Sequence, residues 1–227
     1  MKPRRIVDSC ALSGGRTLEL HEHDGRPTLH VHGEQVVDWR TAGAEAELAR
    51  LACAPFRPAR QPRIMLVGLG LGNILRAVAE ALPQKRAKFI VAESISPLVA
   101  WHRQGLAGLD AGLLTDPRVE LRPVDATAAL HDHDLAPHAI LLHLDAGAVL
   151  ADGPGSAPTD DRAWLAAACD VLRPGGLLAV GALHRQRDLT RHLRKAGFDV
   201  AETNVHGSSA KQKPRPLWLA RKRNNQA

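Results

Sequence analysis

The sequence contains no tyrosine, and its 3 cysteines are few for 227 residues. Cys10, Cys53 and Cys169 lie far apart and are odd in number, which argues against a disulfide framework or a zinc site and favours free thiols in a reducing cytosol. No apolar run approaches the roughly 20 residues that span a bilayer. The charged residues 1–5 have no apolar stretch behind them that would make a signal peptide. These absences predict a cytoplasmic protein without membrane contact.

The charge of the chain is positive, because 30 Lys and Arg against 24 Asp and Glu give a formal net charge of +6. A solvated basic tail is the favoured interpretation of the C-terminal excess, and a contact with nucleic acid is the less favoured alternative. The hydrophobic content of 44% is ample for one large domain, or for one domain with a small appendage. The basic residues of the tail are Lys211, Lys213, Arg215, Arg221, Lys222 and Arg223.

Residues 63–72 combine a short apolar run with glycines at alternate positions. Residues 64–67 predict a buried parallel strand, and the helical spacing of apolar residues in 73–82 predicts a helix. Strand, glycine turn and helix begin a nucleotide-binding βαβ unit. The glycine spacing lacks the pyrophosphate fingerprint, so it suits a nucleoside without phosphates, such as S-adenosylmethionine; the alternative is a glycine-rich turn without a ligand. The glycines are Gly68, Gly70 and Gly72.

Acidic residues end the next two predicted strands. Glu93 ends the strand at 87–93, 21 positions after the last of these glycines. A carboxylate about 20 positions beyond a glycine turn can bind ribose hydroxyls, and a surface carboxylate is the alternative. Asp125 and Ala126 follow the strand at 119–124. Asp125 is placed to accept the exocyclic amine of adenine or to cap the next helix, and the two roles are compatible.

From residue 63 onward, predicted strands and helices alternate, which favours a mostly parallel sheet with helices on both faces. The fourth strand, 139–144, precedes Asp145 and should lie beside the glycine turn, at the crevice where such sheets bind ligands. The fifth strand is expected at 177–183, and segments 198–205 and 217–221 form a final antiparallel hairpin. The prediction is an α/β fold with a Rossmann-like, methyltransferase-type sheet of seven strands, mostly parallel with an antiparallel C-terminal strand.

The chain divides into two predicted parts. Residues 1–60 predict a small N-terminal unit with a β-hairpin and a helix at 42–54, which Pro55 and Pro58 end. Residues 61–227 predict the nucleoside-binding, Rossmann-like catalytic domain.

The N-terminal hairpin is predicted from two alternating segments, 17–23 and 28–32, around a turn. Pairing of residue 23 with residue 28 would place Leu20 opposite Val31. One face would then be apolar and the other rich in imidazoles. Neighbouring imidazoles can bind a metal, but a solvated face or a subunit contact is favoured, and no metal is expected. The histidines of this face are His21, His23, His30 and His32.

Six segments together form a recognisable pattern: VGLGLG at 67–72, VAE at 91–93, DPRVE at 116–120, AILL at 139–142, LRPGG at 172–176 and AGF at 196–198. This pattern resembles the spermidine synthase family, the polyamine aminopropyltransferases, and more closely its short bacterial spermidine synthase-like members. The similarity spans nearly the whole chain, and the N-terminal hairpin is similar to that family's small β domain. Methyltransferases that use S-adenosylmethionine share the glycine turn, the acid and the proline-glycine-glycine.

The resemblance implies decarboxylated S-adenosylmethionine as donor, an amine as acceptor, a role in polyamine biosynthesis and a homodimer. Only a neutral amine attacks the carbon bonded to a sulfonium, so an acceptor pocket needs carboxylates that hold one amine and a base that deprotonates the other. The resemblance makes Asp145 the base or amine anchor, with His143 beside it. Glu45, near a family glutamate, is a further candidate for substrate binding, with an exposed helix residue as the alternative.

The sequence departs from the family at the acceptor side. Leu71 stands where authentic members carry Asp in the glycine turn, His143 stands where they carry Asp at the fourth strand, and the tyrosines of their acceptor pocket are absent. Three functions follow, in order of preference. The first is an aminopropyltransferase with an eroded diamine site, the second a methyltransferase that uses ordinary S-adenosylmethionine on a non-polyamine acceptor, and the third a non-catalytic binding subunit.

Overall fold

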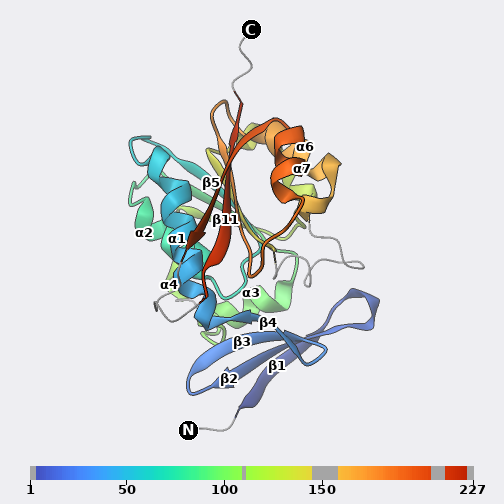
Figure 1. Ribbon diagram of the computed structural model, residues 1–227. Coiled ribbons are helices and arrows are strands. Elements are labelled where there is room, and N and C mark those ends of the chain that lie inside the picture. Colours follow the sequence, from blue (N-terminus) through green and yellow to red (C-terminus); the bar gives the residue numbers. More distant parts are fainter. Residues whose placement is uncertain (1–3, 109–110, 145–157, 206–212, 224–227) are drawn as a thin grey trace.

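The computed structural model describes residues 4–108, 111–144, 158–205 and 213–223, and these form two sheets (Figure 1). The smaller sheet has the order β1-β2-β3-β4, with β1 (Arg5–Ala11), β2 (Thr17–His23), β3 (Arg26–Val31) and β4 (Glu34–Asp38). The larger sheet contains β5 (Arg63–Val67), β6 (Lys88–Ala92), β7 (Val119–Arg122), β8 (Ala139–His143), β9 (Leu177–Gly181), β10 (Phe198–Val205) and β11 (Arg215–Lys222).

The larger sheet has the strand order β10-β11-β9-β8-β5-β6-β7. The strands from β7 to β9 pair in parallel, and β11 runs antiparallel to both of its neighbours. The predicted seven-stranded, mostly parallel sheet is therefore confirmed. The strand order reverses at β5, so the crevice beside the carboxyl end of β5 is where a sheet of this kind binds its ligand.

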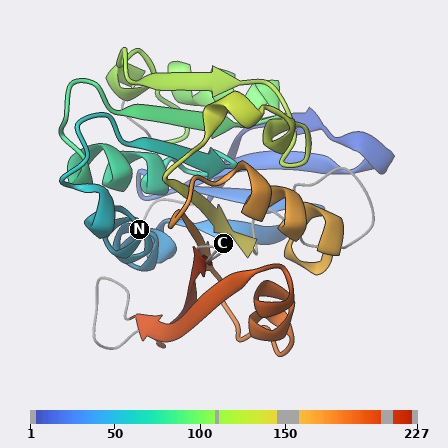
Figure 2. The same cartoon turned by 90° about the horizontal axis from the view of Figure 1, so that it is seen from above.

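Helices cover both faces of the larger sheet (Figure 2). Apolar side chains of α1 and α2 pack with Ile64 and Leu66 on one face, and those of α6 and α7 pack with Met65 and Ile140 on the other. Because β5 is buried on both faces, its sequence is a continuous apolar run. The helices are α1 (Ala42–Cys53), α2 (Asn73–Ala81), α3 (Ser96–Arg103), α4 (Ala111–Leu114), α6 (Arg162–Val171) and α7 (Leu189–Lys195).

The N-terminal sheet is larger than predicted, and the predicted register of its hairpin is wrong. Strands β1 and β4 flank the predicted hairpin, and His23 pairs with Arg26, so that Leu20 lies opposite Leu29. Asp24 and Gly25 both have positive φ, at 50° and 74°. These values suit a two-residue hairpin turn of type I′, in which Asp-Gly is favoured. Since the shift is two residues, each side chain keeps its predicted face.

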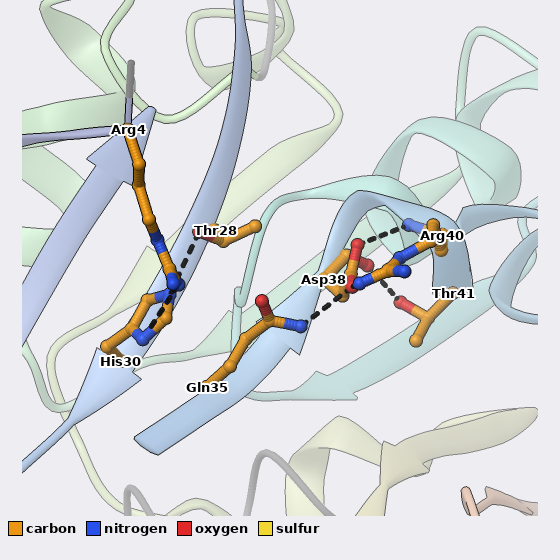
Figure 3. A network of polar contacts seen from close by, with 7 residues as sticks. All are labelled: Arg4, Thr28, His30, Gln35, Asp38, Arg40 and Thr41. Carbon is orange, nitrogen blue, oxygen red and sulfur yellow. Dashed lines mark hydrogen bonds and ion pairs between the residues drawn. The ribbon is translucent and has the colours of Figure 1, made fainter. Parts of the chain in front are cut away.

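Polar side chains of this sheet and of the turn after it form a network of contacts (Figure 3). His30 is 1% exposed, lies against the Arg4 guanidinium and has its Nε2 3.1 Å from the hydroxyl of Thr28. The ring of His21 stacks on that of His30 with centroids 4.0 Å apart. Within the described part of the chain, no three His, Cys, Asp or Glu side chains are grouped so that they could hold a metal ion.

An apolar cluster joins the two sheets. Leu18 and Leu29 of the N-terminal sheet pack in the same cluster as Leu71 of the glycine turn and Leu98 of α3. The indole N–H of Trp101 on α3 also donates a hydrogen bond of 2.7 Å to Asp8 of β1. The N-terminal sheet therefore lies against the carboxyl edge of the larger sheet (Figure 1).

Basic residues at the end of β11 bond to the chain itself. The Lys222 ammonium donates to the carbonyls of Asp170 and Leu172, at the C-terminal end of α6. Arg221 donates to the carbonyl of Gly175 and Arg223 to the carboxylate of Asp199. Cations at a helix C-terminus are stabilising, so part of the C-terminal positive charge has a structural role. No described helix is long and apolar enough to cross a membrane.

Candidate functional site

The glycine turn after β5 forms an open cradle. Gly68, Gly70 and Gly72 have φ values of 87°, 53° and 76°, in the left-handed region that other residues rarely adopt. A Cβ placed on Gly68 or Gly70 would meet no atom within 4 Å. The turn is tied to the next strand by the Gly68 N–H, which donates 2.8 Å to the carbonyl of Ala92. The backbone is thus held in place while space remains open beside it.

Glu93 lies directly after β6 and points at this turn. One carboxylate oxygen accepts the N–H of Leu69 at 2.9 Å, and the other accepts the N–H of Ile95 at 2.8 Å. Burial raises the pKa of the Glu93 carboxyl, and the two N–H donors offset part of that rise. A carboxylate offers about four acceptor positions, so the two N–H groups leave Glu93 with capacity to accept further hydrogen bonds.

Asp125 and Ala126 lie at the end of the third parallel strand, as expected. One carboxylate oxygen of Asp125 accepts the N–H groups of Thr127 at 2.8 Å and Ala128 at 2.7 Å. These two bonds are the capping role that the sequence offered for Asp125, and the adenine role stays a prediction. The carbonyl of Ala126 accepts the indole N–H of Trp164 at 3.1 Å, which fixes the loop against α6.

His143 ends β8 and faces the side of the sheet that α1 covers. A Cβ on Gly181, its partner in β9, would lie 3.3 Å from the His143 ring and 3.3 Å from Leu48 of α1. His143 is half-buried. Asp145, the other predicted catalytic residue, lies outside the described residues.

Glu45 is buried rather than exposed, contrary to the alternative that sequence left open. It lies in the first turn of α1, is 7% exposed and accepts a hydrogen bond of 2.8 Å from the side chain of Asn73. Asn73 is the first residue of α2 and directly follows the glycine turn. The structure therefore brings a carboxylate from the N-terminal part of the chain to this turn, although sequence gave Asn73 no visible signal.

Leu71 lies in an apolar environment. It is 4% exposed and packs with side chains of the N-terminal sheet and α3. An acid at this position would enter an apolar cluster, so the departure from the family pattern has a structural counterpart.

His102 on α3 is a residue of this site that sequence reasoning missed. Its side chain is fully buried, and its Nε2 lies 2.8 Å from the carbonyl oxygen of Gly70. Burial is the main cause that lowers the pKa of His102, the nearby Arg76 lowers it further, and the bond to Gly70 opposes both. A histidine within a helix carries no local pattern that would indicate this contact.

Solved structures of other proteins match the fold of this chain, whereas no protein-family model and no curated protein matches its sequence. A spermidine synthase from Thermotoga maritima matches with a TM-score of 0.73 at 16% identity, over 96% of this chain and 73% of that one. A spermidine synthase in complex with the transition-state analogue AdoDATO matches with a TM-score of 0.68 at 16% identity, over 96% and 72%. A methyltransferase from Geobacter sulfurreducens matches with a TM-score of 0.53 at 20% identity, over 83% and 81%.

Identities this low establish shape and not activity. The match to the spermidine synthase from Thermotoga maritima extends over 96% of the chain, which contains both the four-stranded and the seven-stranded sheet. The chain therefore has the fold of the spermidine synthases, which is built on the sheet of the S-adenosylmethionine-dependent methyltransferases.

Proposed function

We propose that this protein is a transferase that binds an S-adenosylmethionine-type nucleoside at the glycine turn and transfers a carbon group from its sulfonium to an acceptor. The observation that carries the proposal is the buried carboxylate of Glu93 on the N–H of Leu69, beside open space at Gly70. This combination supports a ribose held by the carboxylate and an adenosine held against the backbone.

The chemistry places modest demands on the protein. The lone pair of the acceptor forms a bond to the carbon next to the sulfonium, the carbon–sulfur bond breaks, and its electrons leave with sulfur as a neutral thioether. A proton leaves the acceptor in the same event or before it. The protein has to hold the two reactants in line and supply a base.

Within this class we infer aminopropyl transfer from decarboxylated S-adenosylmethionine to an amine as the first candidate. The match to the spermidine synthase from Thermotoga maritima covers 96% of the chain, whereas the Geobacter methyltransferase covers 83%. The buried carboxylate of Glu45 beside the turn also suits a cationic group. Asp145 or His143 would act as the base in this proposal.

The assay is formation of 5′-methylthioadenosine from decarboxylated S-adenosylmethionine with putrescine, other diamines and spermidine. Glu93→Ala should abolish product, and Asp145→Asn should lower turnover at least 100-fold if it is the base. Glu80→Gln, on the exposed face of α2, is the matched control. Absence of product from the wild-type protein with every amine would contradict aminopropyl transfer.

A methyltransferase is the second candidate, and the buried apolar Leu71 favours it. Without a carboxylate at that position, the site lacks one partner for a cationic amine acceptor. Calorimetric titration with both donors separates the candidates. Tighter binding of ordinary S-adenosylmethionine would support methyl transfer, and tighter binding of the decarboxylated form would support aminopropyl transfer. If the protein binds neither donor, the third function, a non-catalytic binding subunit, is the one that remains.

A further inference from the structure

His102 and Glu93 both bond to the backbone of the glycine turn. Both belong to the segment that follows β6, and both are buried, at 0% and 6% exposure. Glu93 accepts the N–H of Leu69, and His102 contacts the carbonyl of Gly70. Two side chains thus fix neighbouring peptide groups of a turn that is otherwise rich in glycine.

The hydrogen bond of His102 has a defined direction. A carbonyl oxygen only accepts, so Nε2 must carry the proton and donate it to Gly70 at 2.8 Å. Nδ1 is then the bare nitrogen of a neutral ring, and within the described residues this buried atom has no hydrogen-bond partner. A buried acceptor without a partner costs free energy. The bond to Gly70 is thus the single polar contact of the ring in the described structure.

The turn needs such a restraint. Glycine at a positive φ of 53° has no Cβ that would oppose rotation of the peptide group between Gly70 and Leu71. Because that peptide is planar and trans, the direction of the Gly70 carbonyl also sets the opposite direction of the Leu71 N–H. A nucleoside that packs on this backbone meets one surface if the carbonyl points at α3 and another if the peptide rotates.

We propose that His102 is a positioning residue of the nucleoside site. Its Nε2–H holds the Gly70 carbonyl toward α3 and so sets the shape of the glycine turn before the ligand arrives. A turn that is already in its bound shape binds more tightly, because less ordering is left to binding. This inference rests on the proposed nucleoside site and names a side chain outside its direct contacts.

The test compares His102→Gln with His102→Met. The amide nitrogen of Gln lies near the position of Nε2 and can donate to Gly70, whereas Met fills a similar volume without a donor. We expect His102→Met to weaken binding of 5′-methylthioadenosine about tenfold, as loss of one hydrogen bond does, and His102→Gln to stay within about threefold of wild type. Hydrogen–deuterium exchange of the amides in residues 68–72 should rise in the Met variant alone.

A matched control separates positioning from general stability. His138 is also buried, at 7% exposure, but lies at the other edge of the sheet, where its Nδ1 accepts the N–H of Arg63. His138→Met should lower thermal stability without changing nucleoside affinity. Equal loss of affinity in the two Met variants, or a Gln variant as weak as His102→Met, would overturn the proposal. If His102→Met fails to fold, retention of affinity and of slow exchange in His102→Gln decides the question.

Failure of the His102 proposal can be distinguished from failure of the proposed nucleoside site. If wild-type protein binds neither 5′-methylthioadenosine nor either donor, the nucleoside site is wrong. The exchange comparison in residues 68–72 then still shows whether His102 sets the turn, and unchanged exchange in both variants would reject that as well.

Discussion

The glycine turn and the end of β8 lie at the same edge of one sheet, but they are built from different parts of the chain. At the turn, main-chain groups of Leu69 and Gly70 meet the buried side chains of Glu93 and His102. At the end of β8, the ring of His143 and the side chain of Leu48 both lie 3.3 Å from where a Cβ on Gly181 would be. The first region uses backbone geometry, and the second depends on which side chains project from the strand end.

The fold maintains the backbone of the glycine turn, whereas it does not determine which side chains project from the end of β8. A backbone cradle follows from glycines and strand order, so it persists as long as the sheet folds. Side chains that project from a strand end can change while the backbone of the sheet stays the same. The donor class is therefore better supported here than the acceptor.

The largest effect is expected from restoring the family's acid at Leu71. Leu71→Asp places a carboxylate in the cluster that joins the two sheets, and we expect a loss of about 4 kcal/mol in the free energy of unfolding. Urea denaturation measures it. Leu71→Met keeps the volume and should cost less than about 1.5 kcal/mol. If Leu71→Asp were as stable as wild type and bound putrescine more tightly, the expected loss of stability would be wrong. The site would then bind an amine once the carboxylate is present.

A pH titration compares the two edges of the sheet. At the amino edge, burial and then the Arg173 guanidinium lower the pKa of His138 from 6.5 to about 4. The unfolded chain therefore binds a proton between pH 6.5 and 4 that the folded chain does not, so this stability is present above 6.5 and lost as pH falls toward 4. The loss should be roughly 3 kcal/mol.

His138→Gln should remove that component, so the difference in unfolding free energy between the variant and wild type should shrink as pH falls. Urea denaturation at pH 7.5, 6.5, 5.5 and 4.5 measures it. Nucleoside affinity at pH 7.5 should not change in this variant. A pH-independent difference would show that the ring titrates in the folded protein as it does when unfolded.

The next effect is at Glu93. In Glu93→Gln one of the two acceptors becomes an NH₂ group, so either the Leu69 or the Ile95 N–H faces a donor. Loss of one such bond in a buried site costs about 1–3 kcal/mol, and we expect weaker binding of 5′-methylthioadenosine by calorimetry. Glu80→Gln on the surface should change neither the stability nor the affinity for 5′-methylthioadenosine. Unchanged affinity in Glu93→Gln would remove the ribose role.

The smallest effect on stability is expected from replacing a glycine of the turn, Gly70, or a glycine outside it, Gly15, with alanine. Gly70 and Gly15 both have positive φ, and a Cβ at either would meet nothing within 4 Å. Alanine should therefore cost each about 1 kcal/mol of backbone strain. Only Gly70→Ala should also weaken nucleoside binding, because its methyl group enters the open space beside the turn. Equal affinities in the two variants would place the ligand elsewhere.

Sequence predicted the larger sheet well, and it also placed Glu93 next to the glycine turn, because both rest on local patterns. Apolar runs marked the parallel strands, and the spacing from the glycines to Glu93 brought a carboxylate to the turn. The outer strands of the small sheet were missed. A register shift interrupts β1 between Ile6 and Asp8, and β4 has five residues, so neither shows a clean alternation.

Sequence could not predict contacts that depend on packing between distant segments. His102 and Gly70 are 32 positions apart, and Asn73 and Glu45 are 28 apart. Neither pair has a signature in its own segment. Leu71 was recognised as a departure from a family, but its burial against the N-terminal sheet follows only from how the two sheets meet.

The packing of helix α1 determines where the chain can be divided into fragments. Its buried residues Ala44, Leu48, Ala49 and Ala52 belong to the core of the larger sheet, while Asp38 just before it closes the small one. A fragment that starts after the prolines at 55 and 58 would expose that core and lose Glu45. Anyone who wishes to exchange or delete the N-terminal sheet should cut between residues 38 and 42, where the polypeptide passes from one hydrophobic interior to the other.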